Sequence, residues 1–448
     1  MFKKLTIFGL LLASVNSAAY LKGDFSYEKF QRLNNPEVKS DFDDWTALNM
    51  SYDGSLLNSS TFAETDLRFY INNNRQVNYS LPQAYMEWKD RDRRLSVGRQ
   101  LLNWNENETY WLLDTVNPNQ GMYLLSEKKE GLTGLQYDQR LHDNFTISIF
   151  FSYFNIPALN PGLTIKDGQV TSNSEWVRLP PKAVPLEDKL VPLYIEINQP
   201  DIARDIVLKK SLGVRQAFSW DQQRGEFSSY LLYKPENKLR MNAEAYMNED
   251  LEKINVVASP IVNHHMIYGM QYKQRLGQVK FIAGFDVNDP NAKLGNDFKI
   301  LDAGALKENN KVFESEYFTV KPNYERESYF HTSANLNRGS YMLSLNYIKL
   351  LSDNERGSDD FFSDTVKWKN TIGARVRYYF DDFFNVMIDL KYDMTRKDNI
   401  LKAEANYMLF KKASINIGME LIKAPDENSY WAVYRANDAV YSSLKFLF

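Results

Sequence analysis

Segments of about ten residues in which apolar and polar side chains alternate recur along most of the chain. In residues 370–380, Ile372 and Val376 share one face of an extended strand, while Arg375 and Arg377 share the other. Successive side chains of a strand point to opposite faces, so each segment has one apolar and one polar side. A helix would instead repeat its apolar residues every three to four positions. The chain is therefore predicted to be all-β.

The end of the chain carries the same alternation and closes on an aromatic residue. Val440, Ser442, Leu444, Phe446 and Phe448 fall on one face of a strand. This ending resembles the carboxy-terminal signature read by the bacterial barrel-assembly machinery, which is expected to be a partner through the strand ending at Phe448. Further alternating segments are residues 63–71, 145–153, 239–247, 384–394, 401–409 and 413–421.

The amino-terminus has the features of an export signal. Lys3 and Lys4 precede an apolar run over residues 5–15, and small residues lead to a cleavage site after position 19. This order of charged, apolar and small residues is typical of a secretory signal peptide. We predict a signal peptide over residues 1–19 and a single barrel domain over residues 20–448.

Export and alternation together restrict the fold. No stretch of the sequence approaches the roughly 18 to 20 apolar residues of a spanning helix. Inside hydrocarbon only helices and closed barrels pair every backbone polar group. We therefore expect a transmembrane antiparallel β-barrel of about 16 to 18 strands, with short periplasmic turns and long extracellular loops. Its predicted place is the outer membrane of a Gram-negative bacterium, in contact with outer-membrane lipid and lipopolysaccharide.

Composition excludes several other classes. The chain has 28 Tyr, 27 Phe and 8 Trp although a quarter of it is charged, as a barrel with a lipid face and a water face requires. It has no Cys, which excludes a disulfide framework and thiolate metal sites. The formal net charge of −3 argues against a nucleic-acid partner.

Three long connections are the expected places for function. They lie near residues 103–129, 157–204 and 288–325, between strands that are otherwise joined by short turns. The second contains several prolines between short apolar pieces, which favours folding into the barrel mouth as a constriction or plug. A flap on the outer surface is the alternative for this segment. The third is rich in Asn, Asp and Lys, so a solvated external loop is expected there.

A local motif resembles a known family. Residues 94–100 read Arg-Leu-Ser-Val-Gly-Arg-Gln, and Asn-Trp-Asn-Glu and Asp-Thr-Val-Asn-Pro follow at residues 103–106 and 114–118. Together they resemble the strand-and-loop motif of alginate-export-type porins and related uncharacterised proteobacterial outer-membrane proteins. The resemblance implies a wide barrel but no particular solute. Gly98 permits a bulge that turns Arg99 toward the lumen, with pairing to a neighbouring strand's acid as the alternative.

The polar faces of the expected strands supply candidate pore-lining residues, which carry charges of both signs. Rings of such charges set the field in a water-filled pore and bias which ions pass. Alternatively, they hydrate and cross-link the interior of the barrel without selecting a solute. The candidates are Glu64, Asp66, Arg68, Arg99, Arg240, Glu244, Arg375, Arg377, Asp389, Lys391, Asp393, Lys402, Glu404 and Glu420.

Catalysis and metal binding receive little support. His331, Ser333 and Asn335 share a strand face in a way loosely similar to outer-membrane phospholipase A, but Ala334 stands where that family has Asn. The alternation places His331 and Ser333 toward the lumen and away from lipid. His264 and the next residue, also His, would point to opposite faces of a strand and could not chelate together. No enzyme activity, cofactor or metal is predicted.

The sequence thus favours a passive channel for small hydrophilic or charged solutes, narrowed by a loop folded into its lumen. The competing interpretation is a plugged structural or adhesive barrel whose long loops are its working part. A lipid hydrolase is the remote alternative.

Overall fold

A computed structural model describes most of the chain. Residues 1–18 of the predicted signal peptide and most of the third long connection lie outside the described residues, while Ala19, the last residue of the predicted signal peptide, begins β1 (Ala19–Arg32). The structure describes residues 19–35, 41, 43–55, 61–72, 74–186, 189–220, 224–237, 240–247, 253–290, 317–320, 326–352 and 366–448.

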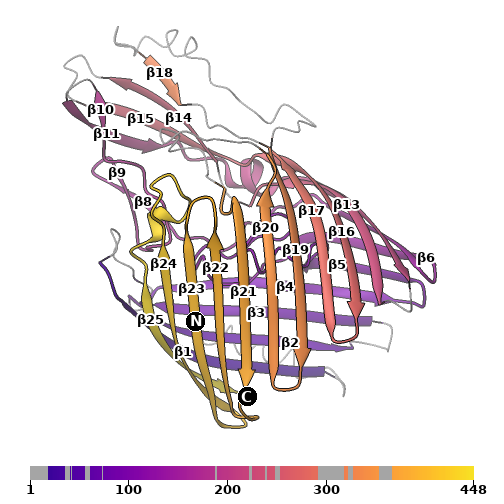
Figure 1. Cartoon of the computed structure of the whole chain (residues 1–448). Coiled ribbons are helices and arrows are strands. Elements are labelled where there is room, and N and C mark those ends of the chain that lie inside the picture. The colour runs from indigo at the N-terminus through magenta and orange to yellow at the C-terminus, as the bar shows by residue number, and fades with distance from the viewer. Residues whose placement is uncertain are drawn as a thin grey trace, which may run out of the picture.

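Eighteen strands form one closed antiparallel sheet (Figure 1). Each strand pairs with its neighbours along the sheet, and β1 pairs with both β2 and β25, which closes the barrel. The predicted fold class and strand number are confirmed. The strands are β1 (Ala19–Arg32), β2 (Asp44–Ser55), β3 (Thr61–Asn72), β4 (Val77–Lys89), β5 (Arg93–Gln100), β6 (Leu132–His142), β7 (Phe145–Ser152), β12 (Ser211–Trp220), β13 (Gly225–Pro235), β16 (His264–Leu276), β17 (Val279–Asp289), β19 (Glu327–Arg338), β20 (Tyr341–Leu350), β21 (Asn370–Tyr379), β22 (Phe384–Asp393), β23 (Asn399–Phe410), β24 (Ala413–Lys423) and β25 (Ala439–Leu447).

The carboxy-terminal strand closes the barrel against the first strand. Phe25 lies opposite Phe446 in the ladder between β1 and β25. Beyond the last paired residue, Gly23 and Phe448 exchange two backbone hydrogen bonds of 3.1 and 2.9 Å. The alternating segment that ends the sequence is therefore strand β25, which closes the barrel by pairing with β1.

The outer surface of the barrel is apolar. Ile372, Val376 and Ile388, which the alternation places on the apolar face, are 47%, 43% and 49% exposed. The polar residues between them face inward, so the wall has a lipid side and a water side. A closed barrel with this distribution satisfies its backbone inside a bilayer, as the transmembrane β-barrels of bacterial outer membranes do.

Loop lengths differ between the two ends of the barrel. At one end, short turns such as residues 90–92, 143–144 and 339–340 join neighbouring strands. At the other end, the connections are mostly long, which marks it as the extracellular end. Two short helices lie among the long connections, a π-helix η1 (Ile202–Val207) and a 3-10 helix η2 (Ala432–Tyr434). Among the described residues, no helix is long and apolar enough to cross a membrane.

A second, five-stranded sheet stands beyond the long-loop end of the barrel, at the upper left of Figure 1. It is built from separate long connections, and β11 and β15 pair in parallel within it. Val191, Ile195, Ala245 and Val256 form part of its apolar core. Its strands are β10 (Ala183–Leu186), β11 (Lys189–Ile197), β15 (Ile254–Ile261), β14 (Arg240–Met247) and β18 (Tyr317–Val320), beside a separate hairpin of β8 (Leu163–Lys166) and β9 (Gln169–Ser172).

This sheet corrects one strand prediction. The alternating segment 239–247 was expected in the barrel wall, but β14 pairs with β15 and β18 instead. Alternation reports one buried and one exposed face, and a sheet packed over its own small core produces the same pattern as a barrel wall. Arg240 and Glu244 therefore do not stand on a strand of the barrel.

Candidate functional site

The connection between β5 and β6, residues 101–131, lies inside the barrel and is called the inner loop here. It contains almost no regular structure, yet most of its side chains are buried. Leu102, Trp111 and Val116 are completely inaccessible, and Glu108 is 1% exposed. Its side chains bond to inward-facing residues of several wall strands. The first long connection thus lies in the lumen. The second, residues 157–204, which was expected there, joins the outer sheet through β10 and β11 but also packs Leu159 and Trp176 against the inner loop.

One side of the inner loop is fastened to β16 and β17 by an acid. Glu106 accepts a hydrogen bond of 2.9 Å from the Lys273 ammonium and another from Lys280. Burial alone would raise the pKa of Glu106, but the bonds from these two lysines hold its pKa below the usual value. The carboxylate therefore stays ionised at neutral pH and ties the loop to the wall.

A buried polar network continues this attachment around Asp286 of β17. One carboxylate oxygen accepts hydrogen bonds from Asn105 of the loop and His331 of β19, both at 2.6 Å. The other accepts a 2.5 Å bond from the hydroxyl of Tyr230. Asn107 of the loop bonds the second ring nitrogen of His331 at 2.8 Å. Buried polar groups are costly unless they are paired, so this network fixes one position of the loop.

The geometry around His331 bears on the enzyme alternative. Ser333 donates a 3.0 Å hydrogen bond to Asn107 of the inner loop and accepts one of 3.3 Å from Asn335. A serine nucleophile would need its hydroxyl within hydrogen-bond reach of the base. Both side chains face the interior as expected, with His331 inaccessible and Ser333 2% exposed. The hydrogen bonds of His331 and Ser333 to Asn107 hold the inner loop in place.

Another part of the inner loop meets a row of charges on β21 and β22. Arg375 bonds Glu127 of the loop and, at 2.6 Å, Asp389 of the neighbouring strand. Asp389 also accepts bonds from Lys391 at 2.8 Å and from the Tyr110 hydroxyl at 3.1 Å. The Arg375 and Lys391 cations lie 5.0 and 4.5 Å from the centre of the Tyr110 ring. The predicted arginine–acid contact between adjacent strands is present, with a loop acid added to it.

Within the inner loop, a buried ion pair joins its two halves. Lys129 lies 3.0 Å from a Glu108 oxygen that also accepts the backbone N–H groups of Val116 and Asn117. Burial raises the pKa of Glu108 and lowers that of Lys129, while each partner opposes the shift of the other. This pair gives an irregular segment a fixed shape.

Gly98 and Arg99 fasten the base of the loop. Gly98 has a φ of 130°, and a Cβ there would lie 2.3 Å from the carbonyl oxygen of Ala84. Glycine is required for this backbone. Arg99 is 3% exposed and bonds Glu130 of the inner loop at 2.7 Å and the Ile156 carbonyl at 3.0 Å. Arg99 thus pairs with a loop acid and not with an acid of a neighbouring strand.

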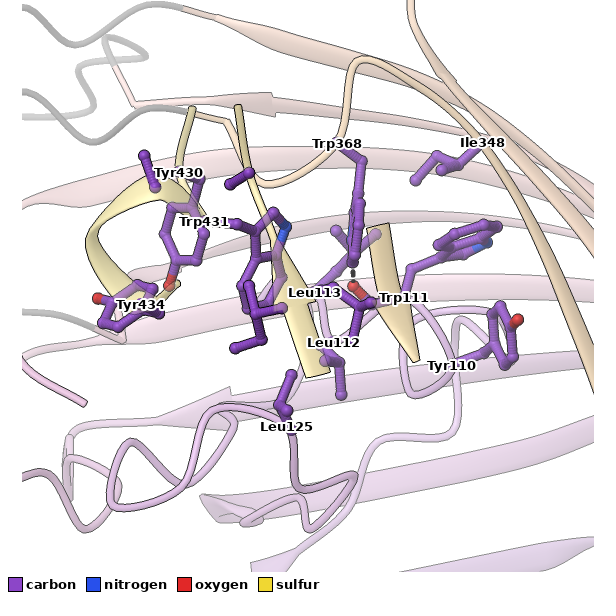
Figure 2. Close-up of a cluster of buried hydrophobic side chains, with 14 of the residues drawn as sticks. Tyr110, Trp111, Leu112, Leu113, Leu125, Ile348, Trp368, Tyr430, Trp431 and Tyr434 are labelled. Atoms are coloured by element: carbon purple, nitrogen blue, oxygen red, sulfur yellow. Dashed lines mark hydrogen bonds between the residues drawn. The ribbon is translucent and has the colours of Figure 1, made fainter. Parts of the chain in front are cut away.

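An aromatic cluster covers the extracellular side of the inner loop (Figure 2). Trp111 of the loop, Trp368 before β21 and Trp431 before η2 are all inaccessible, and we call them the tryptophan cluster. Ring centroids are 5.7 Å apart for Trp111 and Trp368 and 5.1 Å apart for Trp368 and Trp431. The Trp368 indole N–H donates a 2.6 Å hydrogen bond to the Trp111 carbonyl. Side chains of wall strands such as Ile348 and Ile400 pack against this cluster.

Two adjoining cavities lie between the inner loop and the wall formed by β1–β3 and β21–β25. Their volumes are about 420 and 550 Å³, and Glu28, Lys128, Asn416 and Ser443 line both, so we call them the lower chamber. The charged residues lining it are Lys22, Asp24, Glu28, Asp66, Arg68, Glu127, Lys128, Arg375, Arg377, Asp389, Lys391, Lys402, Glu404 and Lys445.

Most predicted wall candidates therefore face the lower chamber, but others have structural partners. Glu64 accepts bonds from Gln83 and Tyr85 at 2.8 and 2.7 Å. Glu420 is 1% exposed and lies 3.1 Å from Lys402. Asp393 accepts the backbone N–H group of residue 369, just before β21, and that of residue 396 in the β22–β23 turn.

Sequence reasoning missed the inner-loop residues and their lysine partners. Tyr110, Trp111 and Glu127 belong to a connection whose aromatic and acidic content was visible but was not interpreted. Lys273 and Lys280 stand on β16 and β17, which the alternation analysis did not assign. Among the described residues, no group of three or more His, Asp or Glu side chains is placed to hold a metal ion.

Comparisons with known proteins leave the family open. No family model and no curated protein matches the chain, so the resemblance to alginate-export-type porins is not confirmed. Solved structures that are similar include Pseudomonas aeruginosa OccK2 (OpdF) in complex with glucuronate, at 8% identity over 96% of this chain and 97% of the other, with a TM-score of 0.49. The Pseudomonas aeruginosa outer membrane protein OpdK has 9% identity over 97% and 99%, with a TM-score of 0.49. Salmonella typhi OmpF in complex with daunomycin has 11% identity over 96% and 97%, with a TM-score of 0.46.

Proposed function

We propose that the protein is a passive outer-membrane channel for small hydrophilic or charged solutes, constricted by the inner loop. The observation that carries the proposal is the position of this loop, which Glu106 fastens to β16 and Glu127 to β21, while Tyr123 packs on Phe30 of β1 across the barrel. A loop held across a barrel narrows the lumen without filling it, because the lower chamber remains open on one side of it.

The charges around the lower chamber support a hydrated route. Arg377 and Lys128 line it and have no carboxylate partner among the described residues, whereas Arg375 and Lys391 share Asp389. A charge that faces water in a confined space changes the local concentration of ions of opposite sign. Because the charges of Arg375 and Lys391 are balanced by Asp389, the electrostatic field in the chamber depends mainly on a few side chains such as Arg377 and Lys128.

The tryptophan cluster supports the second candidate function, a plugged surface barrel. Trp111, Trp368 and Trp431 are inaccessible and join the inner loop to two extracellular connections. An apolar cluster of this size does not hydrate readily. If it remains closed, transport through that part of the lumen is blocked and the outer sheet becomes the exposed working surface.

Single-channel recording in planar bilayers separates the two candidates. The inner-loop variant replaces residues 105–127 with a short glycine–serine linker, and a matched control removes residues 182–197, which carry β10 and β11 of the outer sheet. Circular dichroism verifies that each purified protein is a folded barrel. We expect conductance from the unmodified protein, a rise of severalfold in the inner-loop variant, and no comparable rise in the control.

The other outcomes are equally informative. A silent unmodified protein with a conducting inner-loop variant would establish a plugged barrel. Silence of all three folded proteins would exclude the channel. A rise in conductance only after removal of residues 182–197 would assign the constriction to the outer sheet.

A further inference from the structure

The chain continues the β7–β12 pair past the end of the barrel wall. The last paired residues are Ser152 and Ser211. Beyond them, the backbone N–H of Asn155 donates a 2.8 Å bond to the Val207 carbonyl, and its side-chain amide donates one of 3.3 Å to the Ile206 carbonyl. Residues 153–156 and 206–210 therefore lie side by side at the extracellular rim.

This extension presents an unusual amount of apolar surface. Tyr153 is 62% exposed, Phe154 52%, Leu208 57% and Leu212 53%. It is continuous with the lipid-facing side of β7, because the rings of Phe151 and Tyr153 are in edge contact at 4.8 Å. Aromatic side chains at the end of the apolar band of a barrel lie where lipid headgroups begin.

Cations lie within the same surface. Lys210 is exposed between Leu208 and Leu212, and Lys209 is half-buried beside it. Neither ammonium lies within 4 Å of a carboxylate in the part of the chain that the structure describes. Asp205 pairs with Arg204 at 3.2 Å and is also stabilised at longer range by the charge of Lys209. The backbone carbonyl of Lys210 bonds His264 at 3.2 Å, which holds this segment against β16. The cations are thus fixed beside apolar groups at headgroup level.

We propose that this surface is a binding site for a phosphorylated lipid of the outer leaflet, namely the lipid A part of lipopolysaccharide. Lys209 and Lys210 contact a phosphate, and Tyr153, Phe154 and Leu208 pack against the acyl chains. The combination selects an amphiphile, because a free anion would use only the cations and an uncharged lipid only the apolar groups. The inference does not depend on whether the barrel conducts.

The test uses the full-length, delipidated protein and titrates it with lipopolysaccharide while binding is measured by microscale thermophoresis. The variant Lys209→Gln/Lys210→Gln is expected to lose about tenfold or more in affinity, since each cation near an anionic lipid surface contributes severalfold. The variant Tyr153→Ala/Leu208→Ala is expected to lose affinity through its acyl contacts. Lipid A without phosphates should bind the unmodified protein as weakly as lipopolysaccharide binds the lysine variant.

The matched control is Lys411→Gln/Lys412→Gln. These two lysines are also adjacent and exposed, and they follow Leu409 and Phe410, which are 45% and 55% exposed, but they stand at the periplasmic end of the barrel. Their replacement should leave affinity unchanged. Equal losses of affinity in both lysine variants would mean that any exposed lysine pair attracts the lipid through its charge, and would overturn the proposed site.

Three further results would also overturn the proposal. They are the absence of saturable binding to the unmodified protein, full affinity in the Lys209→Gln/Lys210→Gln variant, and competition by inorganic phosphate as strong as that by lipid A. The last result would identify a site for the free anion. Circular dichroism of each variant excludes loss of the barrel as the cause of weaker binding.

Discussion

Two long connections leave the same end of the barrel and take different courses. The inner loop, residues 101–131, turns into the lumen, while the connection over residues 153–210 packs Leu159 and Trp176 on the inner loop and then joins an outer sheet through β10 and β11. The inner loop has a single proline, Pro118, and satisfies its polar groups through side chains such as Asn105 and Glu127. The outer segment pairs its backbone in strands, of which β11 joins β15. The difference teaches that the source of hydrogen-bond partners decides where a long loop can lie.

The pattern of burial in β11 explains why prolines and apolar pieces did not lead that segment inward. Val191, Leu193 and Ile195 are buried in the outer sheet, while Leu190 and Tyr194 are 75% and 42% exposed. Apolar residues at alternate positions need only one packed face, and the outer sheet provides it. A segment without such alternation has to find its partners in the lumen or in water.

The largest expected effect follows from Trp111→Ala. Removal of an inaccessible tryptophan that packs on Trp368 should cost about 3 to 5 kcal/mol of local stability. We expect the inner loop to detach, with faster hydrogen exchange over residues 101–131 and higher conductance. Leu190→Ala in the outer sheet, where the side chain is 75% exposed, is the control and should change neither. Equal hydrogen-exchange rates over residues 101–131 in the two variants would show that Trp111 does not hold the inner loop in the lumen.

A second prediction concerns pH and the extracellular side of the tryptophan cluster. Asp398 accepts a hydrogen bond from Ser429, and burial raises the pKa of this carboxyl to about 6. A folded pKa above the unfolded value near 3.9 means that the folded state holds the proton more tightly. Docking of residues 424–438 should therefore be strongest below about pH 4 and weaken by roughly 2 to 3 kcal/mol as the pH rises to 6.

Asp398→Asn should abolish this dependence while keeping an acceptor for Ser429. Hydrogen exchange of residues 424–438, compared between the variant and the unmodified protein at each pH, measures the effect. Residues 189–197 of the outer sheet serve as the internal reference. A pH dependence that persists in the variant would assign it to another group.

A smaller effect is expected from Glu127→Gln. The change weakens one wall attachment of the inner loop, but Arg375 keeps Asp389 and the Glu127 side chain is partly exposed, so the loss should be about 1 kcal/mol. More frequent transitions between current levels are expected in single-channel records. Combining the change with Arg375→Gln measures the coupling of the pair. Additive effects would show that the contact does not hold the loop.

The smallest effect is expected from Arg377→Gln in the lower chamber. Arg377 contacts the Met387 sulfur at 3.2 Å and no carboxylate among the described residues. Loss of its charge should shift the reversal potential under a salt gradient by a few millivolts toward cation preference. Arg338→Gln, at an exposed periplasmic turn, is the control. An equal shift in both would mean that the chamber charges do not set selectivity.

Alternation together with the export signal was enough to predict the barrel. Alternation also predicted its outer face and the position of Arg375 beside Asp389, because these depend on neighbours in the sheet. It failed at β14, where the outer sheet has the same period as the wall. It also could not identify the inner loop, because the partner of Asn105 is 181 residues away and that of Tyr110 is 279 residues away. Local patterns carry no information about such distant pairs.

The long sequence separation of the inner-loop contacts has a consequence for assembly. Trp111 meets Trp368 across 257 residues, and Glu127 meets Arg375 across 248. Synthesis and strand addition must therefore reach β21 and β22 before one whole side of the loop has anything to hold. The inner loop is therefore expected to dock late in folding. It can reach its final position only after the last third of the chain has joined the first, shortly before pairing of β1 with β25 closes the barrel.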